Sequence, residues 1–313
     1  MNTCSLLIHP HELSKSWIDR MVKNKIPTIA LHPVGGPKSH ENLKDLIERC
    51  KTKEFQSLID YAYENGLNVE YEMHSMSYLL PRELFEKKPE WFRINKDGVR
   101  SSDWNCCAHN DEALDYIAER AAELAKSLYR STDRYFFWLD DSRDSACYCD
   151  KCKGMSASDQ QLKILNHILR RLKKDNPNAK LAYLAYFECL QPPVKVKPEK
   201  DIFVEFAPFD RDYHKPIEGN NQGETLTELL KTFGKDTAKI LDYWYDNSLY
   251  SDYKKPPKEF SADVPVIEAD FAYYRRLGFE DISSFACYFG DDYTELYGEV
   301  DISAFSKAYY NGL

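Results

Sequence analysis

Short apolar segments alternate along the chain with longer segments in which apolar residues recur at helical spacing. We expect strands in the short apolar segments, at residues 5–9, 28–33, 68–75, 135–139, 180–188, 201–208, 238–246 and 281–290. The helical spacing predicts helices at residues 14–25, 41–65, 111–129, 158–174, 224–233, 264–277 and 301–311. Ser158 is the expected N-cap of the helix at residues 158–174.

Strands that alternate with helices are typical of a parallel sheet, and eight such units predict a closed (β/α)8 barrel, the TIM-barrel fold of the α/β class. The fifth crossover is expected to be irregular, because residues 191–200 are too few and too rich in proline for a helix. An open, doubly wound sheet is the alternative. No GxGxxG sequence follows the first strand, which argues against the common nucleotide-binding form of that fold. Since no internal repeat or linker interrupts the pattern, residues 1–313 are predicted to form a single barrel domain.

Polar and aromatic residues gather at the C-terminal ends of the predicted strands. They are His9, His32, Glu72, His74, Asp140, Asp141, Glu188, Trp244 and Asp246. The N-terminal ends carry mainly residues that look like solvated caps, namely Asn68, Lys180, Asp201 and Asp281. In a barrel the C-terminal strand ends and the loops after them form the functional face, so this asymmetry predicts a site at that mouth.

Two adjacent carboxylates, Asp140 and Asp141, follow directly after the strand at residues 135–139. Strand residues alternate between faces, but the alternation relaxes at a strand end, so we expect both side chains to reach the mouth. Two close carboxylates repel each other, which raises the pKa of one and suits it to act as an acid near neutral pH. A helix-cap or loop-anchoring role is the alternative for each, and Glu188 is a second candidate acid.

The segment at residues 68–75 alternates apolar with polar side chains. Its apolar set (Val69, Tyr71 and Met73) should face the helices, and its polar set (Glu70, Glu72 and His74) the barrel interior. Burying a carboxylate inside a barrel costs free energy unless the group is paired with a positive charge or contacts a ligand. Glu72 and His74 lie nearer the mouth and are therefore candidate ligand-binding residues, with a structural ion-pair network as the alternative.

Aromatic residues occupy the ends of three predicted strands, at Tyr186, Trp244 and Tyr288. Such rings can stack on the face of a sugar, although each could equally fill a core. Asp246 follows Trp244 closely and could hold a sugar hydroxyl. Arg211, just past the strand at residues 201–208, could hold an anionic or hydroxyl-rich ligand, with a surface salt bridge as the alternative.

Composition narrows the classes of partner. The net charge is −9 and no basic stripe is present, which argues against nucleic-acid binding. No apolar run is long enough to cross a membrane, and the N-terminus lacks the pattern of a signal peptide, so a cytoplasmic location is expected. The aromatic content of 14% fits a carbohydrate partner as well as a large core. The sequence does not indicate an oligomeric state.

The nine cysteines are odd in number and scattered, which is unlike a disulfide framework. Cys147, Cys149 and Cys152 cluster in the run CYCDKC, which contains one CxxC spacing. With Cys106, Cys107 or His109 as a fourth ligand, they could form a tetrahedral structural zinc site. Reduced cysteines that pack a loop are the alternative. Acid catalysis by the carboxylates at the mouth requires no cofactor.

The run WLDD…CYCDKC…SDQQLKILNHILRRLKKDNPNAKLAYLAYFECLQPP resembles the core of the domain of unknown function 4838 barrels. These barrels are similar to glycoside hydrolase family 163 and, more distantly, to family 20 hexosaminidases and α-glucuronidases. The resemblance covers roughly residues 68–246. The segment LPRELFEKKPEWFRINKDGVR is also similar to the loop that follows the third strand in many glycosidase barrels.

The resemblance implies a retaining β-N-acetylglucosaminidase whose substrate supplies its own acetamido nucleophile. By position, Asp140 would orient the acetamido group and Asp141 would be the general acid, although family 20 has Glu where this chain has Asp141. That difference leaves open a carbohydrate-binding barrel without catalysis. A third reading is a metal-dependent barrel enzyme, such as a sugar isomerase, with His9, His32, His74 and the acidic strand ends as ligands. The sugar, its linkage and endo or exo action stay open.

Overall fold

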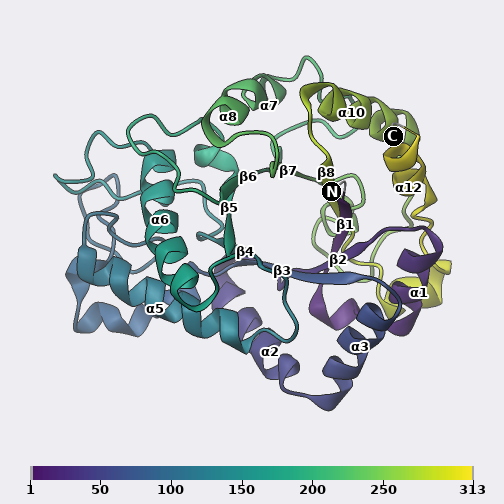
Figure 1. Ribbon diagram of the computed structural model, residues 1–313, viewed down its shortest axis with the longest axis horizontal. Coiled ribbons are helices and arrows are strands. Elements are labelled where there is room, and N and C mark those ends of the chain that lie inside the picture. The colour runs from purple at the N-terminus through teal and green to yellow at the C-terminus, as the bar shows by residue number, and fades with distance from the viewer. Residues whose placement is uncertain (1–2, 312–313) are drawn as a thin grey trace.

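The structure is a computed structural model that describes residues 3–311. Eight parallel strands close into a barrel in chain order, with β1 paired to β8. The strands are β1 (Thr3–Ile8), β2 (Thr28–Leu31), β3 (Asn68–His74), β4 (Arg134–Trp138), β5 (Lys180–Ala185), β6 (Ile202–Phe206), β7 (Lys239–Asp242) and β8 (Asp281–Phe285). Figure 1 looks down this barrel, with helices around it, and confirms the predicted (β/α)8 TIM barrel.

The outer layer consists of long helices with short ones between them. The long helices are α1 (Lys15–Lys23), α2 (Ser39–Cys50), α3 (Lys53–Glu64), α5 (Asp111–Ser127), α6 (Ala157–Asp175), α8 (Leu226–Phe233), α10 (Val264–Leu277) and α12 (Ser303–Tyr310). Short α-helices are α4 (Met76–Leu79), α7 (Asn221–Glu224), α9 (Asn247–Tyr250) and α11 (Asp291–Tyr297). Short 3-10 turns are η1 (Pro10–Glu12), η2 (Gly36–Lys38), η3 (Arg82–Glu86), η4 (Pro89–Trp91) and η5 (Phe187–Cys189). None of the helices in residues 3–311 has the length and apolarity needed to cross a bilayer.

Two helix predictions differ from the structure. The single helix expected at residues 41–65 is divided into α2 and α3, because Thr52 caps a new helix by accepting a hydrogen bond from the Phe55 amide at 3.3 Å. The N-cap of α6 is Ser156 rather than Ser158. Ser156 and Asp159 form a reciprocal capping box, whereas the Ser158 hydroxyl donates to the Gln191 carbonyl.

The fifth crossover is irregular, as predicted, and holds only the short turn η5. Asp159 stabilises it from the start of α6. One oxygen of this carboxylate accepts hydrogen bonds from three successive backbone amides, those of Val194, Lys195 and Val196, at 2.7–2.9 Å. A segment without a helix therefore still has partners for its backbone donors.

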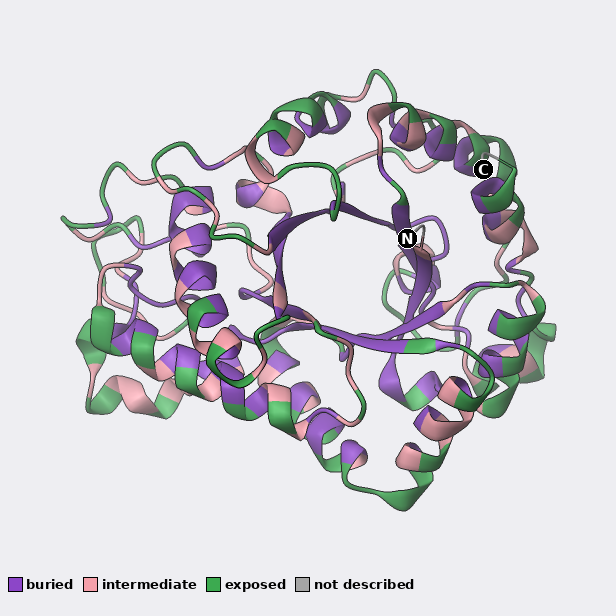
Figure 2. Ribbon diagram, in the orientation of Figure 1, coloured by how far each residue is buried: buried purple, intermediate pink, exposed green. Residues whose placement is uncertain are grey.

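The barrel separates two apolar cores, one between strands and helices and a smaller one inside the ring of strands. Figure 2 shows the ring itself as buried, with the exposed faces of the helices pointing outward. The apolar set of β3, which is Val69, Tyr71 and Met73, belongs to the outer core, as predicted. Glu72, from the polar set of β3, points inside and pairs there with Lys239 of β7.

Candidate functional site

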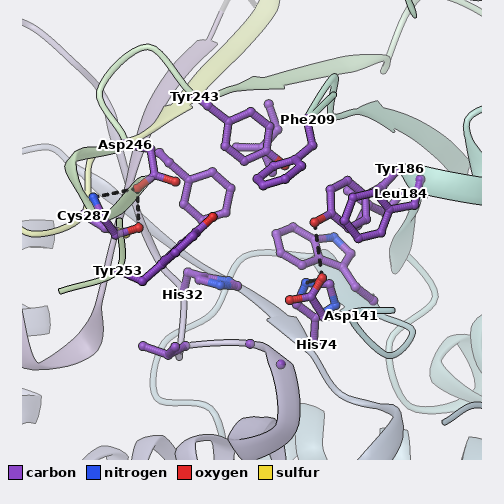
Figure 3. A pocket seen from close by; sticks show the side chains of 18 of the residues that line it. His32, His74, Asp141, Leu184, Tyr186, Phe209, Tyr243, Asp246, Tyr253 and Cys287 are labelled. Carbon is purple, nitrogen blue, oxygen red and sulfur yellow. Dashed lines mark hydrogen bonds and ion pairs between the residues drawn. The ribbon is translucent and has the colours of Figure 1, made fainter. Parts of the chain in front are cut away.

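A cavity of about 440 Å³ opens at the C-terminal mouth of the barrel. Its walls come from strand ends and from the loops that follow them, as Figure 3 shows. The polar side chains that line it include His9, His32, His74, Asp141 and Asp246. Aromatic rings supply much of the remaining wall, and they include Trp138, Tyr186, Phe187, Phe209, Tyr243, Tyr253, Phe285 and Tyr288.

Three histidines stand at the ends of the first three strands and share one arrangement. The Nδ1 atoms of His9, His32 and His74 lie 2.9, 2.8 and 2.7 Å from the carbonyl oxygens of His32, Glu72 and Leu139, respectively. A carbonyl oxygen can only accept, so each Nδ1 must carry the hydrogen. In the neutral ring Nε2 is then left as an acceptor.

Two of these rings resist protonation. Burial lowers the pKa of His9, and burial together with the neighbouring His74 and His9 rings lowers the pKa of His32 well below its ordinary value. His32 also touches the ring of Phe285 edge-on, with centroids 5.1 Å apart. Sequence reasoning named His9 and His32 only as metal ligands, although their position at strand ends marked them as mouth residues.

Asp141 follows β4 and is the more exposed of the two mouth carboxylates, with 28% of its side chain accessible. The Tyr186 hydroxyl donates a hydrogen bond to its Oδ1 at 3.2 Å, and His74 Nε2 lies 4.0 Å from the same oxygen. Gly35, after β2, approaches this pair closely. A Cβ there would lie 2.8 Å from His74 Cδ2 and 3.0 Å from Asp141 Oδ2, so only glycine fits without displacing them.

Asp246 lies across the cavity from Asp141, in the loop after β7 (Figure 3). It is 5% exposed, and its Oδ1 accepts from the Ser248 hydroxyl at 2.5 Å and from the Ser248 amide at 3.0 Å. Burial raises the pKa of Asp246, and the Ser248 hydrogen bonds oppose that rise. These bonds also fix the orientation of the carboxylate, because Asp246 is the N-cap of α9.

The aromatic walls are held tightly. Tyr243 and Phe285 stack with centroids 5.0 Å apart, and Tyr186 and Phe187 stack at 3.7 Å. Phe187 and Tyr288 both have positive φ, at 46° and 67°, which bulky residues rarely adopt. Such conformations persist where the surroundings impose them, and they concentrate at functional sites.

The structure does not bring Asp140 into this cavity. Its carboxylate pairs with Arg82, with Nη2 and Oδ2 2.5 Å apart, while its amide donates to Asn105 Oδ1 at 2.9 Å. Asp140 instead lines a neighbouring polar cavity of about 720 Å³. Burial raises the pKa of Asp140 and the Arg82 charge lowers it. The adjacent carboxylates thus point apart, as strand alternation favours, and only Asp141 reaches the mouth.

Glu188 also lies outside the main cavity. It belongs to η5 and accepts hydrogen bonds from the Ser145 amide and hydroxyl, both at 3.0 Å. These bonds tie the loop after β4 to the loop after β5. Glu188 lines a small recess behind Tyr186 and Phe187 rather than the mouth.

Glu72 is fully buried in the barrel interior, where Lys239 pairs with it and with Glu205. Its strand position brings it below the mouth rather than to it. The alternative that the sequence left open, a structural ion-pair network, describes its surroundings. Glu72 therefore does not line the cavity.

Arg211 and Trp244 lie behind the mouth. The Arg211 guanidinium has no exposed surface and pairs with Asp242 at 3.0 Å and Asp270 at 2.6 Å. The Trp244 indole donates to Asp270 at 2.8 Å and stacks on Phe271 of α10. Neighbouring residues alternate in direction, so Tyr243 enters the cavity and Trp244 faces the helices.

A second cluster of chemically active side chains lies beside the mouth. The sulfurs of Cys107, Cys147, Cys149 and Cys152 are all within 4.8 Å of one another. Across residues 3–311 no other group of three or more His, Cys, Asp or Glu residues brings its ligand atoms so close together. The three mouth histidines thus do not form a compact metal-binding group, which the isomerase alternative would require.

The profile of one protein family, described as Domain of unknown function (DUF4838), matches residues 39–297. The chain belongs to this family. The match begins at α2 and extends through α11, so it takes in six of the eight strands, β3 to β8. A search of curated proteins finds no match.

The first two strands, β1 and β2, precede the matched segment. The cavity residues Asp141, Tyr186, Asp246 and Tyr288 all lie within the DUF4838 match, whereas His9 and His32 lie before it.

Solved structures similar to this DUF4838 chain include glycoside hydrolases. A β-galactosidase from Rahnella sp. R3 is 12% identical with a TM-score of 0.59, and the alignment covers 99% of this chain and 55% of that one. An O-GlcNAc hydrolase mutant from Thermobaculum terrenum is 12% identical with a TM-score of 0.55, covering 99% of this chain and 58% of that one. A family 5 xyloglucanase from Bacteroides ovatus, in complex with a heptasaccharide, is 12% identical with a TM-score of 0.51, covering 100% and 74%.

This chain therefore spans a little over half the length of the β-galactosidase and O-GlcNAc hydrolase chains. At 12% identity these likenesses concern the fold. The DUF4838 barrel is thus built like the barrels of glycoside hydrolases.

Proposed function

We propose that this DUF4838 chain is a glycoside hydrolase whose active site is the cavity at the C-terminal mouth. The observation that carries the proposal is the pair of carboxylates, Asp141 and Asp246, on opposite sides of an aromatic-lined cavity. Glycoside hydrolysis generally uses two carboxylates that flank the scissile bond. The glycoside hydrolase fold of the similar structures supports the same assignment.

Asp141 is the proposed proton donor. It is the more exposed of the two carboxylates, so it lies where a leaving group can depart to solvent. Its Oδ1 already holds the Tyr186 hydroxyl, while Gly35 keeps the backbone of the loop after β2 against its Oδ2. The side chain is therefore held in position before substrate binds, which general acid catalysis requires.

Asp246 is the proposed second carboxylate, which holds the sugar. Ser248 occupies one of its oxygens, so the other is left to accept a sugar hydroxyl. The Nε2 acceptors of the neutral His9 and His32 rings suit further hydroxyl donors. Tyr186, Tyr243 and Tyr288 supply aromatic surface for the apolar face of the ring.

The substrate class that we propose is a β-N-acetylglucosaminide, cleaved with retention and with help from the substrate's own acetamido group. Trp138, Tyr243 and Phe285 form apolar surface in the cavity that suits the acetamido methyl group. The Asp140 carboxylate pairs with Arg82, so the proposal does not assign it to orienting the acetamido group. The resemblance to family 20 supports the substrate class but not this residue assignment.

Hydrolysis of a panel of aryl glycosides tests the proposal, with the β-N-acetylglucosaminide expected to be cleaved fastest. Asp141→Asn should abolish most of this turnover. Asp144→Asn is the matched control, because Asp144 lies in the same loop but pairs with Lys96 outside the cavity. Binding of glycans by calorimetry with no cleavage of any panel member would instead identify a carbohydrate-binding barrel.

A further inference from the structure

We propose that Cys107, Cys147, Cys149 and Cys152 form a structural zinc site beside the mouth. Cys107 lies in the connection between β3 and β4, and the other three lie in the loop between β4 and α6. A metal ion bound by all four would join these two long loops, which hydrogen bonds already hold side by side. The proposal does not depend on the glycosidase assignment.

The sulfur positions fit a tetrahedral ion. Cys107 Sγ lies 3.6 Å from Cys149 Sγ and 3.9 Å from Cys152 Sγ. Four thiolates at a zinc–sulfur distance of about 2.3 Å would be about 3.8 Å apart. These sulfurs are too far apart to be bonded, so the four cysteines meet as free thiols.

The donor set selects the metal. Four sulfurs in a compact group suit zinc or iron, whereas magnesium and calcium prefer oxygen ligands. Zinc is the ion that closed four-cysteine structural sites hold without any redox partner. The four sulfurs leave no ligand position open, as in a closed structural site, and we therefore assign zinc.

The surroundings of the cluster support a ligand role. The Ile94 amide donates to Cys147 Sγ at 3.3 Å, and His109 Nδ1 lies 3.4 Å from Cys152 Sγ. Hydrogen bonds of this kind orient metal-bound thiolates and offset their charge. Cys106, which the sequence left open as a ligand, pairs through its backbone with Phe92 and is not in the group.

The site would hold one wall of the mouth in place. The loop between β4 and α6 carries Asp140 and Asp141 near its start and contains no helix or strand. Tyr148 donates its amide to the Ile94 carbonyl at 2.7 Å, and Arg93 donates to the Ala146 carbonyl at 3.1 Å. A bound ion adds a rigid cross-link at the point where these contacts meet.

Metal analysis of the intact protein, purified without chelator, is the first test. We expect about one zinc per chain in the parent and in Cys106→Ala, and a loss of most of it in Cys149→Ser. Cys106 is the matched control because it neighbours Cys107 and stays outside the group. Stoichiometric iron would overturn the choice of zinc, and unchanged zinc in Cys149→Ser would overturn the ligand set.

A second measurement uses only the parent protein, so it holds even if Cys149→Ser fails to fold. Cobalt exchanged for the metal should give the visible absorption of a tetrahedral thiolate site, and an organomercurial should release the metal as four thiols react. A parent protein that holds no zinc and takes up neither added zinc nor cobalt would overturn the proposal. Neither readout involves glycoside turnover, so the outcome is separate from that of the proposed function.

Discussion

Tyr186 donates a hydrogen bond to Asp141, with the hydroxyl oxygen 3.2 Å from Oδ1. The bond joins residues that follow two neighbouring strands, β4 and β5, and it holds the proposed acid against the cavity wall. Tyr186 is itself fixed by stacking on Phe187. The relationship makes Tyr186 a positioning residue whose loss should be felt through Asp141.

Asp141→Asn should lower kcat for aryl glycosides by about 100-fold or more, because general acid catalysis contributes that much. Tyr186→Phe removes a single hydrogen bond to a carboxyl group and should lower kcat by roughly tenfold. Steady-state kinetics over a range of pH measure both effects. If Tyr186→Phe changes KM alone and leaves the pH profile in place, Tyr186 contacts the sugar and does not position Asp141.

Gly35→Ala should reduce kcat/KM by at least about tenfold while the protein stays folded, because the new Cβ would displace His74 and Asp141 and misplaced catalytic groups are costly. The backbone at Gly35 has φ of −75°, which alanine adopts freely. Gly36→Ala is the matched comparison, since Gly36 has φ of 71° and no atom near its Cβ position. It should cost about 1 kcal/mol of stability and spare turnover. Kinetics and thermal melting on both variants separate the two effects.

The sequence predicted the barrel and the side chains of β3 that face its interior. Both predictions rest on local patterns: the order of strands and helices along the chain, and the alternation of apolar and polar residues within a strand. It also located α10, whose bounds match the helix expected at residues 264–277. The sequence did not predict which way a side chain points once the strand has ended. The segment predicted as a strand at residues 238–246 ends as β7 at Asp242, and Tyr243 rather than Trp244 enters the cavity.

Long-range partners explain the other differences. Asp140 turns away from the mouth because Arg82 is available to pair with it from a loop 58 residues earlier in the chain. Arg211 is buried because two carboxylates, Asp242 and Asp270, meet it from different elements. Such pairings depend on how distant loops pack, and no local pattern of residues encodes them.

Lys239→Met should destabilise the fold by about 3 kcal/mol, because it leaves Glu72 and Glu205 buried without their positive partner. Glu72→Gln should also lower the melting temperature but leave KM within about twofold of the parent, since Glu72 has no exposed surface. Denaturant unfolding and kinetics measure these effects. Lys180→Met, at the partly exposed start of β5, is the control for loss of a lysine. A large rise in KM for Glu72→Gln would return Glu72 to the list of sugar-binding residues.

His32 should make the fold less stable in mild acid. Its folded pKa lies well below the ordinary value of 6.5, so below about pH 6.5 the unfolded chain binds a proton that the folded protein does not. The free energy of unfolding should therefore fall as pH decreases from 6.5, by up to about 1.4 kcal/mol per pH unit for this group.

His32→Asn keeps a donor for the Glu72 carbonyl but cannot titrate, so the difference between parent and variant isolates His32 from the buried carboxylates. Denaturant unfolding between pH 5 and 8 should show a shallower slope for His32→Asn than for the parent. Equal slopes for the parent and His32→Asn would mean that the folded protein protonates His32 as readily as the unfolded chain does.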